Sequence, residues 1–405
     1  MNHQETTQTF IEFFRERGHQ PIPSSSLVPR PGDPVLFTSA GMHPLTPYLE
    51  GRPHPAGSRL VNVQRCLRTT DLDEVGDRTH LTVFEMLGSW SLGDYPGTQS
   101  VRWGLELVRD GFGIPVSRLY ATVYGGPDAG GVEPGVGPDT DLAETWADLG
   151  VPVELSGLDN WWSNGPTGLC GTDSELFVWT GDGPPQGTPG TDGRWLELWN
   201  HVLLRYWRLD DGRLKPLDRP NVDTGMGLER LLTVLQGSDS VFGCDLLQPW
   251  TSAVRDRWPL DETALRLVTD HLRSSVVVLG DGVRPSNTGR GYVLRRLIRR
   301  ALTALWQVDR AGTLEDLPSG LITDTLRHFG QDTPGERPGG ELVREVLLGE
   351  QQRFGDLLSR GREVLRRRRG TGPLTEEEFR YLHETHGLPR EFVTAMLEQH
   401  VGPEA

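Results

Sequence analysis

The sequence predicts an α+β protein in which an antiparallel sheet flanked by helices precedes a mostly helical domain. Between roughly Pro21 and Gly237, short β-like runs are broken by Gly and Pro, which is typical of a sheet with intervening helices. From about Val241 onward, apolar residues recur at helical spacing. A chain of 405 residues is also long enough for two hydrophobic cores. We therefore expect one domain over residues 1–240 and a second over residues 241–405.

The first expected element is a short N-terminal helix. Phe10, Phe13 and Phe14 form an apolar stripe at helical spacing, and they follow Thr6 and Thr7. Threonine is a common N-cap residue, because its hydroxyl accepts a hydrogen bond from a free backbone N–H. We expect the helix to be capped by these threonines.

The clearest helix of the second domain is expected in the segment GYVLRRLIRRALTALW, residues 291–306. Its apolar residues repeat every three to four positions and leave arginines around the remaining face. Residues 330–340 are rich in Gly and Pro and predict an exposed loop, whereas residues 341–369 predict a charged helix.

The composition excludes several classes of protein. A net charge of −15 argues against a protein that coats nucleic acid indiscriminately, because phosphate binding needs clustered positive charge; local basic patches can still bind phosphate. The chain has no apolar leader and no uninterrupted apolar run of about 18 residues, so we expect no membrane segment and a cytoplasmic location.

The cysteines indicate a reducing compartment and no structural zinc. Cys66, Cys170 and Cys244 are widely spaced, odd in number and outside any CxxC pair. No cysteine follows Cys244, and we interpret His383 and His386 as surface histidines.

Three segments carry the strongest functional signal. They are FTSAGM (residues 37–42), QRCLRTTDLDEVGDRTHLTVFEML (residues 64–87) and VDTGMGLERLLTVLQ (residues 222–236). In the third, Gly225 and Gly227 allow the backbone to approach a ligand closely, although glycine spacing taken alone favours a structural turn. Taken together and in this order, the segments resemble the three motifs of class II aminoacyl-tRNA synthetases.

Further blocks narrow the resemblance to alanine–tRNA ligases. These blocks are SSSLVP (residues 24–29), FEMLGSWSLGDY (residues 84–95), VDTGMGLER (residues 222–230) and NTGRGYVLRRLIRRA (residues 287–301). The similarity starts near residue 10 and continues through residue 392. It implies the class II antiparallel sheet, ATP and Mg²⁺ as cofactors, activation of alanine to alanyl-adenylate, and transfer to the 3′ end of tRNA(Ala).

The resemblance also assigns nucleotide-binding residues. Arg68 matches the arginine that grips the α-phosphate, and its planar fork suits that task. His80 and Phe84 form the HxxxF element of the class, with Phe84 stacked on adenine and His80 near the outer phosphates. Arg230 matches the arginine over the other adenine face, so Arg68 and Arg230 are the expected catalytic residues. Met86 shares the strand face of Phe84 and is expected to complete the nucleotide pocket.

The amino-acid pocket is assigned in the same way. Asp223 corresponds to the carboxylate that pairs with the substrate ammonium, Asn200 and Val202 resemble the family's WNxV element, and Trp162 resembles the tryptophan that closes the pocket. Gly225 allows close approach of the backbone. Structural alternatives remain open: core packing for Trp162 and Val202, and a helix N-cap for Asp223.

The segment GPTGLCGTDSEL (residues 165–176) departs from the family pattern. Pro166 stands where an aspartate is usual, and Asp173 stands where a cysteine is usual. Glu175 is a candidate metal or ribose contact by resemblance, with an exposed loop carboxylate as the alternative, so the metal ligands are unknown. The motif-2 loop RTTDLDEVG is also shorter than in bacterial members, which puts its contact with the tRNA acceptor end in doubt.

The helical domain resembles the part of the family that recognises tRNA. Asn287 matches an asparagine near the identifying acceptor-stem base pair, and Glu384 replaces an aspartate in a later related segment. A charged helix is usually a solvated or salt-bridged face, so the phosphate contacts rest on the resemblance alone. The arginines concerned are Arg290, Arg295, Arg296, Arg299 and Arg300.

Two other functions compete with alanine–tRNA ligation. One is a paralogue that activates a small amino acid for transfer to a carrier protein or small molecule. The other is a binding module without catalysis, which the intact Arg68, Asp223 and Arg230 disfavour. The family's zinc-binding editing domain and C-terminal oligomerisation region have no counterpart in these residues, so we expect activity without editing and leave the oligomeric state open.

Overall fold

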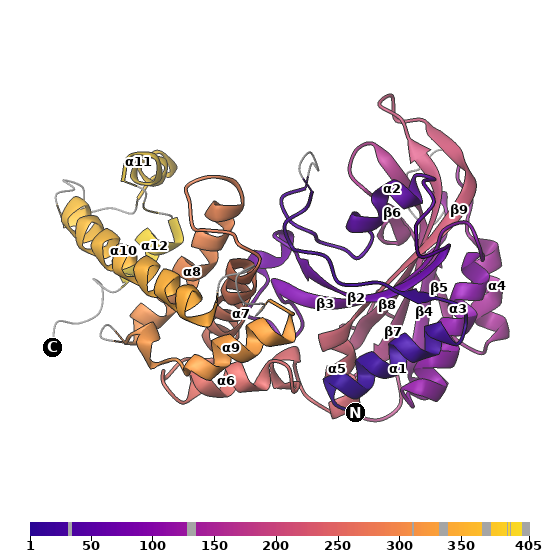
Figure 1. Cartoon of the computed structure of the whole chain (residues 1–405), viewed down its shortest axis with the longest axis horizontal. Helices are drawn as coiled ribbons and strands as arrows, with labels where there is room; N and C mark the ends of the chain where they lie inside the picture. The colour runs from indigo at the N-terminus through magenta and orange to yellow at the C-terminus, as the bar shows by residue number, and fades with distance from the viewer. Residues whose placement is uncertain are drawn as a thin grey trace. The chain divides into compact units, whose positions relative to one another are not determined.

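The computed structural model describes residues 1–30, 35–127, 135–309, 312–331, 339–366, 374–386, 388 and 390–398. The chain forms two compact units (Figure 1). The first comprises residues 1–67 and 84–246, and the second comprises residues 68–83 and 247–405. Within the described ranges, every helix is too short or too polar to cross a membrane.

The first unit is built on one sheet, to which the described residues contribute nine strands in the order β1-β2-β3-β9-β8-β7-β4-β5, with β6 pairing to β7. The five pairs β3–β9, β9–β8, β8–β7, β7–β4 and β7–β6 are antiparallel. Parallel pairing occurs between β1 and β2 and between β4 and β5, so the expected antiparallel sheet is confirmed at its centre and is mixed at its edges. The strands are β1 (Gln20–Pro21), β2 (Arg59–Leu67), β3 (Val83–Ser91), β4 (Leu119–Tyr124), β5 (Val153–Ser156), β6 (Trp161–Ser163), β7 (Gly168–Trp179), β8 (Trp195–Arg208) and β9 (Leu214–Gly227).

Helices complete this unit and confirm the predicted α+β class. They are α1 (His3–Arg15), α2 (Thr46–Leu49), α3 (Gly97–Glu106), α4 (Thr140–Asp148) and α5 (Leu228–Gln236). The predicted threonine cap of α1 is wrong: the side chain of Asn2 accepts from the backbone N–H of Glu5, and Thr6 is buried inside the helix. Asn2 and Glu5 form a reciprocal capping box, which satisfies two backbone donors at once.

Helices α3 and α4 cover one face of the sheet. Ser100 of α3 lies with its hydroxyl 3.0 Å from Nδ1 of His201 on β8, and Trp146 of α4 donates to the hydroxyl of Ser174 on β7 at 2.8 Å. A side chain at Gly104 of α3 would place its Cβ 2.7 Å from the His201 ring. The absence of a side chain there therefore lets α3 pack directly on the sheet.

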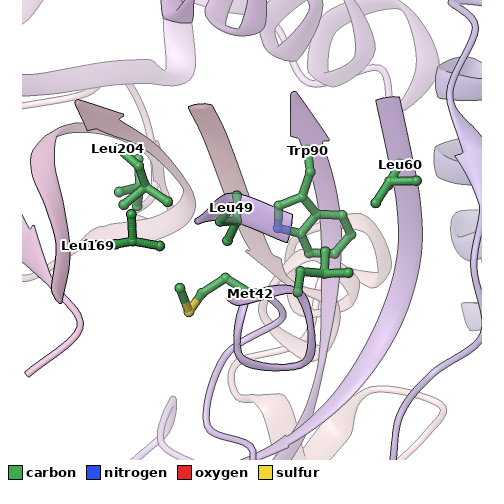
Figure 2. Close-up of a cluster of buried hydrophobic side chains, with 8 residues drawn as sticks. Met42, Leu49, Leu60, Trp90, Leu169 and Leu204 are labelled. Carbon is green, nitrogen blue, oxygen red and sulfur yellow. The ribbon is translucent and has the colours of Figure 1, made fainter. Parts of the chain in front are cut away.

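The other face carries a hydrophobic cluster, which Figure 2 shows. Strand residues and the segment around α2 contribute to it, and Trp162 and Trp207 pack against it as half-buried rings. The buried members are Met42, Leu45, Leu49, Leu60, Trp90, Leu169, Val202 and Leu204. This cluster supports the surface on which the candidate site lies.

The second unit is mostly helical, as predicted. Its helices are α6 (Gln248–Arg255), α7 (Glu262–Gly280), α8 (Gly289–Val308), α9 (Ser319–His328), α10 (Gly340–Arg366), α11 (Glu376–His386) and α12 (Arg390–Glu398). The expected helix at residues 291–306 is confirmed within α8. Of the expected loop and charged helix, residues 332–338 and 367–369 lie outside the described part of the chain.

The segment of residues 68–83 belongs to this second unit although it lies far from it in sequence. Buried Asp270 of α7 accepts from the backbone N–H of Thr82 at 2.8 Å and from its hydroxyl at 2.5 Å. The guanidinium of Arg273 donates to the carbonyl of Val83 at 2.9 Å. A buried polar network on α7 therefore fixes the end of this segment.

Candidate functional site

Four side chains form a row across the central strands of the first unit. Strand register places Trp90 on β3 opposite Asp223 on β9, Asp223 opposite Val202 on β8, and Val202 opposite Asp173 on β7. Residues directly opposite one another in antiparallel strands project from the same face of a sheet. The row thus places an apolar side chain between two carboxyl groups.

Asp223 is the central acidic group of this row. Its side chain is buried, and its Oδ1 accepts a hydrogen bond from Nε1 of Trp90 at 2.6 Å. Burial raises the pKa of Asp223 to about 7, whereas the hydrogen bond from Trp90 lowers it. The alternative of a helix N-cap is wrong, because Asp223 lies within β9 and the N-cap of α5 is Gly227.

A second row lies two residues further along the same strands. Gly88 on β3 faces Gly225 on β9, Gly225 faces Asn200 on β8, and Asn200 faces Glu175 on β7. The Asn200 Oδ1 atom is buried and has no hydrogen-bond partner among the described residues. An unpaired buried acceptor is costly, so this atom suits a donor supplied by a ligand.

Val202 and Trp162 lie on the hydrophobic cluster. Val202 is a buried member of the cluster, and Trp162 on β6 packs against it while remaining half-buried. The core-packing alternative therefore holds for Val202, but its neighbours on both sides are Asp173 and Asp223. Val202 thus contributes both to the core and to the surface between the two carboxyl groups.

Carboxyl groups are concentrated on the β7 side of the two rows. Burial raises the pKa of Asp173 to about 7 and that of Glu175 to about 9. The negative charge of Glu197 raises both values further. The alternative of an exposed loop carboxylate is wrong for Glu175, which lies within β7 and is half-buried, whereas Pro166 is exposed.

The predicted adenine-binding residues of the first unit lie on β3 and α5. Phe84 and Met86 both belong to β3 and are two residues apart, so they share a face. Met86 lies directly above Gly225, because a Cβ at Gly225 would be 2.7 Å from its Sδ. Arg230 in the first turn of α5 pairs with the Glu197 carboxylate at 2.8 Å, which holds the guanidinium against β8.

Arg68 and His80 lie in the second unit. Arg68 directly follows β2 and is half-buried, and its backbone N–H donates to the carbonyl of Thr82 at 3.0 Å. Nδ1 of His80 lies 2.6 Å from a carboxylate oxygen of Asp77, and Nε2 lies 3.1 Å from one of Glu74. A phosphate contact by His80 would require the ring to exchange one of these partners.

The arginines of α8 have several different environments. Arg295 makes two contacts of 3.2 Å with the fully buried carboxylate of Glu350 on α10, and it also donates to the amide oxygen of exposed Asn287. Burial lowers the pKa of Arg299, which lies near the same carboxylate. Arg290 is half-buried.

Two further arginines of α8 contact the segment of residues 68–83. Arg296 and Arg300 pair with the Asp73 carboxylate at 3.1 and 3.0 Å, and Arg300 also donates to the carbonyl of Leu72. The side chain of Glu384 lies outside the described residues.

Sequence reasoning missed three polar partners at the site. Trp90 donates to Asp223, Glu197 pairs with Arg230, and buried Asn160 donates from Nδ2 to Oδ1 of Asp173 at 2.9 Å. Trp90 had a visible signal, because it falls at the same two-residue spacing as Phe84 and Met86. Glu197 and Asn160 had no such signal in the sequence. The partner of Glu197 depends on where β8 places it, and that of Asn160 depends on a short 3₁₀ turn.

The described residues contain no group of three or more His, Cys, Asp or Glu side chains placed to hold a metal ion. Magnesium in nucleotide-dependent enzymes is commonly held by one or two carboxylates together with substrate phosphates, which requires no such cluster.

Comparisons of the sequence with protein families and with individual proteins agree on one family. The family described as tRNA synthetases class II (A) matches residues 5–401. An alanine–tRNA ligase of Treponema pallidum (strain Nichols) is 38% identical over 415 residues, which cover 96% of this chain and 67% of the relative. One of Treponema denticola is 42% identical over 339 residues, covering 78% and 55%. One of Rubrobacter xylanophilus is 37% identical over 426 residues, covering 98% and 47%. The chain thus spans about half to two thirds of the length of these relatives.

Proposed function

Because the chain belongs to the tRNA synthetases class II (A) family, we propose that it activates alanine with ATP and transfers the alanyl group to the 3′ end of tRNA(Ala). The observation that carries this proposal is the pair of polar groups at the amino-acid end of the site. Asp223 offers a buried carboxyl group, and Asn200 offers a buried oxygen without a partner among the described residues. Both suit the α-ammonium of an amino acid.

The apolar residues of the proposed amino-acid pocket limit the size of the substrate side chain that it can hold. The ionised Asp223 pairs with the substrate ammonium, and Oδ1 of Asn200 accepts a second of its three N–H donors. Val202 and Trp162 border the same face of the sheet and leave an apolar contact for a short side chain. Gly225 opposite Asn200 has no side chain, and the side chain of Met86 occupies the room above it. Alanine is therefore the proposed substrate.

Nucleotide binding is assigned by resemblance, and for Phe84, Met86 and Arg230 their placement within the first unit supports it. Phe84 stacks on one face of adenine, Arg230 covers the other, Met86 borders the pocket, and Arg68 grips the α-phosphate while His80 lies near the outer phosphates. The alanine carboxylate attacks the α-phosphate in line and pyrophosphate leaves, so the protein acts by positioning and electrostatics. Mg²⁺, when bound, would neutralise negative charge on the phosphates.

We assign acceptor recognition to residues 241–405 and amino-acid activation to residues 1–240. Exposed Asn287 is the proposed contact to the acceptor stem, with Arg290 and Glu384 as further contacts. Arg295 and Arg296 pair with Glu350 and Asp73 within the helical unit, and Arg299 is half-buried there. Any phosphate contact that Arg295 or Arg296 makes is additional to its ion pair. Transfer to a carrier protein or small molecule is not favoured, because the compared relatives are alanine–tRNA ligases.

The proposed transfer is tested by incubating the protein with labelled alanine, ATP, Mg²⁺ and total tRNA, and counting acid-precipitable label. We expect ATP-dependent label that is released by mild base, as an aminoacyl ester is. Formation of alanyl-adenylate without any label on tRNA would contradict the assignment of tRNA as the acceptor. A tRNA(Ala) transcript with an altered acceptor stem serves as the matched control.

A further inference from the structure

Asp270 of α7 is a buried carboxylate to which the proposed reaction gives no task. Only 1% of its surface is exposed, and the two residues that contact it most closely, Thr82 and His271, are fully buried. Its Oδ1 accepts from the backbone N–H of Thr82 at 2.8 Å. Its Oδ2 accepts from the Thr82 hydroxyl at 2.5 Å and lies 2.8 Å from Nδ1 of His271. Both carboxylate oxygens of Asp270 therefore hold the same residue, Thr82.

Thr82 in turn holds the backbone of Arg68. The carbonyl of Thr82 accepts the N–H of Arg68 at 3.0 Å. Thr82 thus connects Asp270, through its N–H and hydroxyl, with Arg68, through its C=O. Hydrogen bonds to an ionised group are shorter and stronger than those between neutral groups, so the carboxylate is a firm support for Thr82 and for the arginine bonded to it.

The residue after Thr82 is also held by α7. The backbone N–H of Val83 donates to the hydroxyl of Ser274 at 3.2 Å, and the guanidinium of Arg273 donates to the carbonyl of Val83 at 2.9 Å. Of the four backbone polar groups of residues 82 and 83, three bond to side chains of α7 and the fourth bonds to Arg68. Moving these residues along α7 would break several buried hydrogen bonds at once.

We propose that Asp270 is a positioning residue for amino-acid activation: by holding Thr82, it fixes the place from which Arg68 reaches the α-phosphate. The assignment rests on the proposed function, in which Arg68 grips that phosphate. It also gives residues 241–405, whose proposed task is acceptor recognition, a part in activation. Misplacing a catalytic group by about 1 Å can slow a reaction about a hundredfold, so a support of this kind acts on the chemical step without contact with a substrate.

The test is a double-mutant cycle of Asp270→Asn and Arg68→Ala, with alanyl-adenylate formation measured as single-turnover release of pyrophosphate at saturating ATP and alanine. Asparagine keeps the shape of the side chain, but its NH₂ group accepts no hydrogen bond, so one of the two Thr82 donors loses its acceptor. We expect Asp270→Asn alone to slow this step at least tenfold, with KM for alanine within about twofold of the wild type. In the Arg68→Ala background, the same substitution should change the rate by less than about twofold, because its effect passes through Arg68.

A pair of substitutions at Thr82 tests the same connection without altering α7. Thr82→Val removes the hydroxyl that donates to Asp270 and keeps the branched shape of the side chain, so it should slow adenylate formation about tenfold. Thr82→Ser keeps the hydroxyl and should stay within about twofold of the wild type. If Asp270→Asn does not fold, as judged by thermal melting, Thr82→Val takes its place in the cycle with Arg68→Ala.

Ser275→Ala is the matched control. Ser275 is fully buried on the same helix, and its hydroxyl donates within α7, to the carbonyl of His271, at 2.6 Å. Its rate should stay within about twofold of the wild type. Equal loss in the wild-type and Arg68→Ala backgrounds, equal rates for Thr82→Val and Thr82→Ser, or an equal loss in Ser275→Ala would overturn the positioning role alone. Absence of alanine-dependent pyrophosphate release in the wild type would instead overturn the proposed function, and the positioning role with it.

Discussion

Replacing Trp90 by Phe tests whether the ionisation of Asp223 controls alanine binding. Trp90 is fully buried, and its Nε1 donates to Oδ1 of Asp223 at 2.6 Å. Phenylalanine keeps an aromatic ring over Gly88 and Gly41, against which the indole packs, but removes the donor. A hydrogen bond to a charged group contributes about 1.5–3 kcal/mol, and one pKa unit corresponds to about 1.4 kcal/mol. The pKa of Asp223 should therefore rise by about one to two units above its value of about 7.

The assay is kcat/KM for alanine in pyrophosphate exchange, measured between pH 6 and 9. Only the ionised carboxylate pairs with the ammonium, so kcat/KM should rise with pH through the pKa of Asp223 in the wild type. In Trp90→Phe, the rise should move about one to two pH units higher, with a loss of about tenfold at pH 7.5 that narrows as the pH increases.

Trp207→Phe is the matched control, because Trp207 packs against the same hydrophobic cluster and has no hydrogen bond to Asp223. Its pH profile should coincide with that of the wild type. A Trp90→Phe profile that is lower at every pH without a shift would contradict the effect of Trp90 on the pKa of Asp223, since it would mean that the indole only fills space. Thermal melting of both variants separates loss of folding from loss of binding.

Three further predictions concern separate parts of the protein. Arg68→Ala should lower alanyl-adenylate formation about 10²–10³-fold, as expected when a donor to developing charge is removed, measured as single-turnover release of pyrophosphate. Asp223→Asn should abolish alanine binding yet raise the melting temperature at pH 8. In the folded protein this carboxyl ionises only near pH 7, against 3.8 for an unperturbed aspartate, so its charge opposes folding by about 4 kcal/mol above pH 7. Asn287→Ala should reduce alanine transfer to tRNA about tenfold while pyrophosphate exchange stays within about twofold, because Asn287 is exposed in the helical unit.

Each of these predictions has a clear contrary result. A change of less than about threefold in Arg68→Ala would remove its assigned role. For Asp223→Asn, the stabilisation should grow as the pH rises from about 4 to about 7, since only the unfolded state carries the charge in that window; a gain independent of pH would contradict the burial argument. Equal loss of exchange and transfer in Asn287→Ala would mean that this residue supports structure and does not contact tRNA.

The sequence predicted the fold class and the helices of the second unit because both depend on local patterns. Gly- and Pro-punctuated β-like runs indicated the sheet, and the three-to-four-residue repeat indicated α8. The parallel pairing at the sheet edges and the Asn2 cap were not predicted, since the first depends on chain topology and the second on a reciprocal side-chain contact.

The resemblance could name candidate site residues, but the sequence could not predict how their side chains interact. The resemblance named Asp223, Asn200 and Val202, but the two adjacent rows in which these residues lie depend on the register of β7, β8 and β9. That register shifts between Cys170 and Asp173 of β7, a change that no local propensity encodes. The raised pKa values of the buried acids likewise depend on surroundings contributed by several strands.

Amino-acid-dependent ATP–pyrophosphate exchange across all twenty amino acids shows whether the pocket on the central strands selects a small amino acid. We expect Mg²⁺-dependent exchange that is greatest with alanine and weaker with glycine and serine, because a small pocket excludes these two only by about 1–3 kcal/mol. We expect no exchange with amino acids that have large side chains. Absence of exchange with alanine, glycine and serine alike, or greater exchange with a large amino acid, would contradict the pocket built from Asp223, Asn200 and Val202.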